Sequence, residues 1–181
     1  MFLSSLLQQG HKGVDQAKRR KPVEAETLSF FEDILERGLT LRVRVTGESM
    51  KPFLRGGEIV SIKKESPDGL RKGDLLFFKN CHGPPLLHRL IQKCNTPDGE
   101  ITFLTKGDAL LALDKPVPYH SILGKVSRIE KRNARAGSKY KDMESLHWRM
   151  MNATTAYLSL LTSRLRCGLS RLKGLASSRS S

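Results

Sequence analysis

Residues 41–64 read LRVRVTGESMKPFLRGGEIVSIKK. From Leu41 to Val45, apolar side chains occupy every second position and arginines lie between them. This period of two is typical of a strand with one buried face. A second strand-like run begins at Glu58, directly after a pair of glycines. The segment therefore predicts two strands joined by a short constrained loop.

Similar patterns continue downstream. Further strand-like runs are Asp74–Lys79, Leu86–Lys93, Ile101–Thr105 and Ser121–Lys131. Between the runs lie the turn signals Pro67-Asp68-Gly69, Gly83-Pro84-Pro85 and Pro97-Asp98-Gly99. In a Pro-Asp-Gly turn, proline presets φ and glycine accepts a positive φ, which favours a tight reversal. Several short strands with no helix between them predict a mainly β, antiparallel body.

A helix is expected before the first strand. Its apolar face would consist of Leu28, Phe31, Ile34 and Leu35. Ser29 and Glu32 have the spacing of a capping box, and Gly38 is placed to end the helix.

Charge divides the chain into three parts. The formal net charge of the 181 residues is +14. Residues 26–131 carry 17 basic and 14 acidic side chains, whereas residues 132–181 carry ten and two. We therefore expect a flexible basic leader over 1–25, a β domain over 26–131, and a basic tail over 132–181 whose end is disordered. The β domain is nearly balanced in charge, so no specific nucleic-acid partner is expected.

Membrane and redox signals are weak. A spanning helix needs roughly 20 mostly apolar residues, and the longest candidate, Met150–Ser163, has 14 and lies between two arginines. The N-terminus does not read as a secretory signal. Three scattered cysteines favour a reducing compartment. These features predict a cytoplasmic protein or one peripheral at the inner membrane face.

The basic tail contains one helical pattern. After an expected linker at Ala136-Gly137-Ser138, apolar residues recur at helical spacing. They are Met150, Ala153, Tyr157, Leu161 and Leu165. Two interpretations stay open: a helix docked on the β body, or a basic amphipathic helix on an anionic membrane surface.

Ser49 lies in the loop between the first two strands, where a constrained turn could hold a hydroxyl ready for attack. Pro52 stiffens the chain after it. Serine shortly before proline is also ordinary turn chemistry, so this feature alone is not evidence of catalysis.

Five ordered motifs change that interpretation. They are Ser49-Met50-Lys51-Pro52, Lys72-Gly73-Asp74, Leu87-His88-Arg89, Thr105-Lys106-Gly107-Asp108 with Asp114 beyond it, and Leu123-Gly124-Lys125. Over about residues 40–131, the series resembles the signal peptidase I and LexA-like serine peptidase superfamily. It is most similar to the branch typified by the endoplasmic-reticulum and archaeal signal peptidases.

The resemblance implies a serine endopeptidase that cleaves peptides or precursor proteins after small residues. Its nucleophile would be Ser49 and its general base His88. Asp114 would complete the set by orienting the imidazole. Asp108 is the rival for that third role, but we expect its carboxylate to hold the turn by accepting backbone N–H bonds, with Lys106 also structural.

The resemblance also implies a substrate groove lined by Met50, Pro52 and Phe53, and neither a metal nor an organic cofactor. The chain departs from the family pattern in four places. These are Gly47, which brings no hydroxyl to an oxyanion hole, Glu58, Ala109 and Leu113. The Ser49 backbone N–H would then carry more of the oxyanion stabilisation.

Other interpretations remain. A zinc site could be drawn from Cys81, His82, His88 and Cys94, although their spacing matches no common pattern. Self-cleavage of the LexA type could occur at the small residues Ala134-Arg135-Ala136-Gly137. A non-catalytic module could use its basic tail to bind RNA or anionic lipid.

Overall fold

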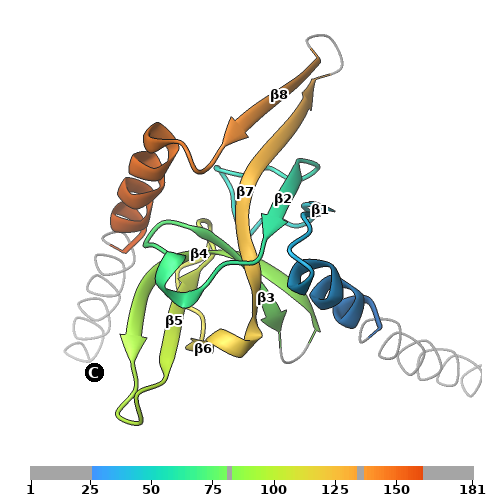
Figure 1. The fold of residues 1–181 in the computed structure, drawn as a ribbon. Coiled ribbons are helices and arrows are strands. Elements are labelled where there is room, and N and C mark those ends of the chain that lie inside the picture. The colour runs from blue at the N-terminus through green and yellow to red at the C-terminus, as the bar shows by residue number, and fades with distance from the viewer. Residues whose placement is uncertain (1–25, 81–82, 134–136, 161–181) are drawn as a thin grey trace, which may run out of the picture.

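The computed structural model describes residues 26–80, 83–133 and 137–160 (Figure 1). Within them the chain forms eight strands and two short 3₁₀ turns. The strands are β1 (Leu41–Arg44), β2 (Ile59–Lys63), β3 (Leu75–Asn80), β4 (Gly83–Asn95), β5 (Ile101–Lys106), β6 (Val117–Pro118), β7 (Ile122–Asn133) and β8 (Gly137–Asp142), and the turns are η1 (Pro67–Gly69) and η2 (Tyr119–Ser121). Residues 26–36 and 146–160 are helical. The predicted mainly β fold with a helix at each end is confirmed.

One antiparallel sheet contains all the strands, in the order β1-β2-β7-β3-β4-β5-β6, with β8 added to β7. Strand β4 pairs with β3 through its first half and with β5 through its second half. Figure 1 shows the N-terminal and C-terminal helices at opposite sides of this body.

The run Leu75–Phe78 is buried on both faces of β3. Leu75 and Phe77 belong to a core formed with β1, β2, β7 and the N-terminal helix, whereas Leu76 and Phe78 belong to a second core with β4, β5 and β6. Because successive side chains point to opposite faces of a strand, one continuous apolar run serves both cores.

The N-terminal helix packs as predicted, since Leu35 is 1% exposed and Leu28, Phe31 and Ile34 pack against the same core. The predicted end at Gly38 is also confirmed, with φ of 72°. The capping box is wrong: residues 26–28 are already helical, so Ser29 lies inside the helix.

The turn predictions were partly wrong. Gly99 has the expected positive φ of 82° in the β4–β5 hairpin. The first Pro-Asp-Gly instead forms η1, capped by the Ser66 hydroxyl, which accepts from the Gly69 N–H. Residues 83–85 begin β4 rather than a turn.

The expected linker at residues 136–138 is also wrong. Gly137 and Ser138 belong to β8, which pairs with the far end of β7 from Arg128 to Asn133. Sheet structure therefore continues past residue 131. The leader, residues 134–136 and the end of the tail lie outside the described residues, so the predictions made for them stay predictions.

The C-terminal helix docks on the β body, but not through the described part of the predicted stripe. Leu161 and Leu165 of that stripe lie outside the described residues. Its buried side chains are Asn152, Ala156 and Ser159, whereas Met150 and Tyr157 are 65% and 62% exposed. Gly73 permits the close approach, because a Cβ there would lie 2.6 Å from the Asn152 carbonyl carbon. Among the described residues, no helix combines the length and the hydropathy needed to cross a bilayer.

Candidate active site

The loop between β1 and β2 presents Ser49. Its two ends are joined by hydrogen bonds from the Val45 N–H to Glu58 O and from the Gly57 N–H to Val45 O, both 2.8 Å. Inside the loop, Met50 and Leu54 are 3% and 2% exposed and anchor it in the first core. Ser49 remains partly exposed on this fixed support.

His88 lies on β4, opposite Leu76 of β3, and is 3% exposed. Its Nε2 lies 3.2 Å from Ser49 Oγ, and its Nδ1 lies 2.7 Å from Asp114 Oδ2. With the proton on Nδ1, the imidazole donates to Asp114 and its Nε2 accepts from the Ser49 hydroxyl. The ring of Phe78 meets the imidazole edge-to-face, with centroids 6.1 Å apart.

Asp114 is fixed by Thr105, a residue to which sequence reasoning assigned no role. The Thr105 hydroxyl donates to Asp114 Oδ2 at 2.7 Å, and the Asp114 N–H donates to Thr105 O at 2.9 Å. Thr105 faces Leu90 in the β4–β5 pairing, two residues beyond His88. The sequence feature that could have indicated this role is the position of Thr105 in the Thr105-Lys106-Gly107-Asp108 motif.

Asp108 pairs with Arg89 rather than with His88. The Arg89 guanidinium donates through Nε and Nη2 to the two carboxylate oxygens of Asp108, at 2.8 and 2.7 Å. Arg89 is fully buried. The predicted backbone N–H partners are therefore replaced by a bidentate ion pair, a structural task with a different partner.

The same arginine reaches the C-terminal helix. Arg89 Nη1 donates to Gly73 O at 3.0 Å and to Asn152 Oδ1 at 2.9 Å. Lys106, 2% exposed, donates to Ser159 Oγ at 2.5 Å. The polar side of the helix thus supplies acceptors for two buried cations, each next in sequence to a residue of the Ser49–His88–Asp114–Thr105 cluster.

The loop after β5 lies against the backbone of Ser49. The Ala109 N–H donates to Ser49 O at 2.8 Å. A Cβ on Gly107 would also lie 2.8 Å from Ser49 O. The segment that leads to Asp114 and the turn that carries Ser49 therefore hold each other in register.

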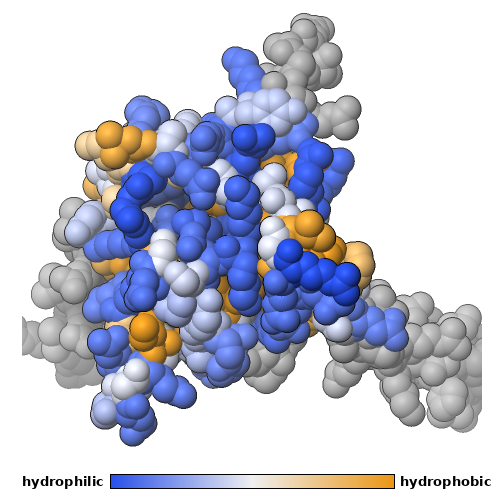
Figure 2. All heavy atoms as spheres, in the orientation of Figure 1, coloured by the Kyte–Doolittle hydropathy of each residue, from blue (hydrophilic) through white to orange (hydrophobic). Residues whose placement is uncertain are grey.

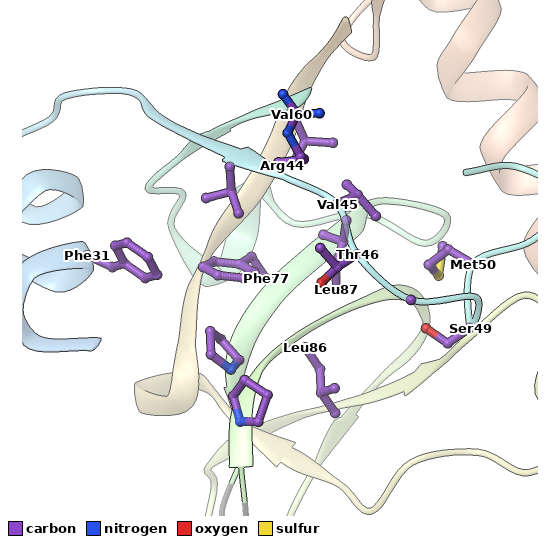
Figure 3. Close-up of a pocket in the computed structure, with 14 residues that line it drawn as sticks. Phe31, Arg44, Val45, Thr46, Ser49, Met50, Val60, Phe77, Leu86 and Leu87 are labelled. Atoms are coloured by element: carbon purple, nitrogen blue, oxygen red, sulfur yellow. The ribbon is translucent and has the colours of Figure 1, made fainter. Parts of the chain in front are cut away.

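A cavity of about 240 Å³ opens beside Ser49 (Figure 3). Ser49 lies at one end and Phe31 of the N-terminal helix at the other. Its walls are mainly apolar and include Met50, Leu86 and Leu87. Of the three predicted groove residues, only Met50 lines this cavity; Pro52 and Phe53 line a separate hollow against the C-terminal helix.

The sequence also offered two alternative sites, a zinc site and a self-cleavage site. For the zinc site, Cys81 and His82 lie outside the described residues, and both ring nitrogens of His88 have partners in Ser49 and Asp114. Among the described residues, no group of three His, Cys, Asp or Glu side chains is arranged to hold a metal ion. Residues 134–136 of the possible self-cleavage site at 134–137 also lie outside them.

No protein-family model matches the chain. It is similar to curated proteins from human, dog and mouse that are named signal peptidase complex catalytic subunit SEC11C. The identity is 34% over 67 residues, which make up 36% of this chain and 35% of the relative. The match thus spans about a third of the length of these relatives, and it supports a signal-peptidase-like relationship.

Proposed function

We propose that the protein is a serine endopeptidase of the signal-peptidase type, with Ser49 as nucleophile, His88 as general base and Asp114 as the carboxylate that orients it. The observation that carries this proposal is the continuous line of contacts from Ser49 Oγ through the imidazole to Asp114 Oδ2. A serine hydroxyl needs a base within hydrogen-bond reach to attack a carbonyl at neutral pH, and His88 supplies one.

In the proposed reaction, Ser49 Oγ attacks the scissile carbonyl carbon while its proton moves to His88 Nε2. The backbone N–H of Ser49 donates to the oxyanion that develops. The C–N bond then breaks, and the imidazolium gives its proton to the departing amine. Water attacks the acyl-enzyme with His88 again as base, which releases the acid product and restores the Ser49 hydroxyl. Asp114 stabilises the imidazolium in both halves.

The substrate is a peptide or precursor protein cleaved after a small residue. In support, the mainly apolar cavity beside Ser49 can receive side chains that precede the scissile bond. The similarity to a signal peptidase catalytic subunit points to the same substrate class.

The test is hydrolysis of peptides with alternating small residues, followed by mass spectrometry. We expect Ser49→Ala and His88→Ala each to lower kcat/KM on the order of 10⁴-fold or more, and Asp114→Asn to do so by a somewhat smaller factor. His120→Ala, at an exposed histidine in η2, is the matched control and should cleave at the wild-type rate. Equal turnover by wild type and the three site variants would remove the assignment.

A further inference from the structure

The C-terminal helix buries two polar side chains and exposes most of its large apolar ones. Its inward side chains are Asn152, Ala156 and Ser159. Its exposed large apolar side chains are Leu146, Met150, Met151, Tyr157 and Leu158, which are 46–72% exposed. A surface helix of a soluble domain ordinarily shows the reverse. Figure 2 shows hydrophobic side chains gathered on the outer side of this helix.

A second exposed apolar segment borders the same region. Residues 109–113 read ALLAL and are all exposed. This loop follows Asp108, which lines a hollow of about 460 Å³ together with Met151 and Leu158 of the helix. Of the eleven exposed large apolar side chains among the described residues, eight come from the helix or this loop. Concentrations of this kind mark interaction surfaces.

Cations lie close to the aromatic side chains of this surface, and two exposed carboxylates, Asp142 and Glu144, precede the helix. Arg149 is the only charged residue between 146 and 160. The Lys72 ammonium lies 3.4 Å from the centroid of the Tyr157 ring, and Lys141 lies 4.5 Å from that of Trp148. In the sequence, the tail from residue 132 to 181 carries ten Lys or Arg and two Asp or Glu. An apolar face bordered by cations complements an anionic lipid headgroup layer over an acyl interior.

We propose that the outer face of the C-terminal helix, together with the 109–113 loop, docks on the surface of a bilayer that contains anionic lipids. The apolar side chains enter the boundary between headgroups and acyl chains. The lysine and arginine side chains remain at the headgroup level, where their long stems let the charge stay hydrated. Pro52 and Phe53 line the hollow beside the helix, so a docked molecule holds the Ser49 loop near the lipid surface.

The test is co-sedimentation of the full chain with vesicles of phosphatidylcholine alone or mixed with phosphatidylglycerol. We expect binding to the mixed vesicles that weakens with added salt. The double variant Leu146→Gln/Met150→Gln removes apolar area without changing charge and keeps good helix formers. Its affinity for the mixed vesicles should be lower than that of wild type by a factor of about ten or more. Phe30→Gln is the matched control, because Phe30 is 62% exposed on the N-terminal helix, and it should bind as wild type.

Ser49→Ala should also bind vesicles as wild type does, so a failure of the peptidase proposal is distinguishable from a failure of this one. Near-ultraviolet circular dichroism checks that the double variant is folded. Three results would overturn the docking proposal. They are no binding of wild type to mixed vesicles, equal binding by the double variant, and a wild-type dimer that the double variant converts to monomer, which would assign the face to a second copy of the chain.

Discussion

Thr105 donates its hydroxyl to Asp114 Oδ2, the same carboxylate oxygen that lies 2.7 Å from His88 Nδ1. A carboxylate held by two donors cannot rotate away from the imidazole without breaking one of them. Thr105 is fully buried, so water does not readily replace its hydroxyl. At the scale of single residues, the candidate triad therefore depends on a fourth side chain.

Replacing Thr105 by valine keeps the shape of the side chain and removes the donor. Because one hydrogen bond contributes about 0.5–1.5 kcal/mol, we expect kcat to fall roughly three- to tenfold with KM little changed. Steady-state kinetics on the best peptide substrate measures this. Thr102→Val in the same strand, where the hydroxyl donates to Cys94 O, is the control and should leave kcat unchanged; a similar loss in both variants would refute a specific role for Thr105.

At the scale of elements, alternation or apolar runs predicted β1, β2, β3, β4, β5 and β7, because these patterns reflect burial in the two cores. The face of the C-terminal helix was not predictable in this way. Hydropathy periodicity counts apolar side chains, whereas this helix buries Asn152 and Ser159 because Arg89 and Lys106 need acceptors. β8 was missed because a ribbon that extends beyond the core has no apolar alternation to reveal it.

The contact between Arg89 and Asn152 joins the C-terminal helix to the strand that carries His88. We expect Asn152→Ala to lower the free energy of unfolding by about 1–3 kcal/mol, because a buried guanidinium donor loses an acceptor. Urea denaturation measures this. Asn152→Asp retains an acceptor oxygen and should recover most of the stability.

The control on the same helix is Thr154→Ala, since Thr154 is exposed and its hydroxyl bonds only within the helix, to Met150 O. Its stability should lie within about 0.5 kcal/mol of wild type. An Asn152→Ala protein as stable as this control would show that the helix docks without help from Arg89.

At the scale of the whole molecule, three of the five ordered motifs meet at one place because the chain crosses the same sheet repeatedly. Ser49 comes from the β1–β2 loop, His88 from β4, and Asp114 from the loop after β5. Residue spacing indicated which side chains were candidates for the catalytic cluster. The family resemblance had already favoured Asp114 over Asp108 for the third role. Residue spacing could not indicate that Arg89 would pair with Asp108, because that contact depends on the register of β4 against β5.

The stability of the whole fold should depend on pH through the buried carboxyl of Asp74. Burial raises the pKa of the Asp74 carboxyl above its usual 3.8, although the Arg71 N–H donates to it at 2.8 Å and opposes the shift. The native state therefore holds the Asp74 proton more tightly than the unfolded chain does. The stabilising contribution of this group is fully present below pH about 3.8 and is lost as the pH rises through the native pKa.

Asp74→Asn keeps an oxygen that can accept from the Arg71 N–H and removes the titration. We expect the free energy of unfolding of wild type, relative to that of this variant, to decline between acidic and neutral pH. At pH 7 the stability of Asp74→Asn relative to wild type should therefore be higher than it is at acidic pH. Asp98→Asn, at an exposed turn position, makes the same change in net charge and should show no such trend. Urea denaturation from pH 4 to pH 8 measures all three proteins, and parallel curves for wild type and Asp74→Asn would contradict the prediction.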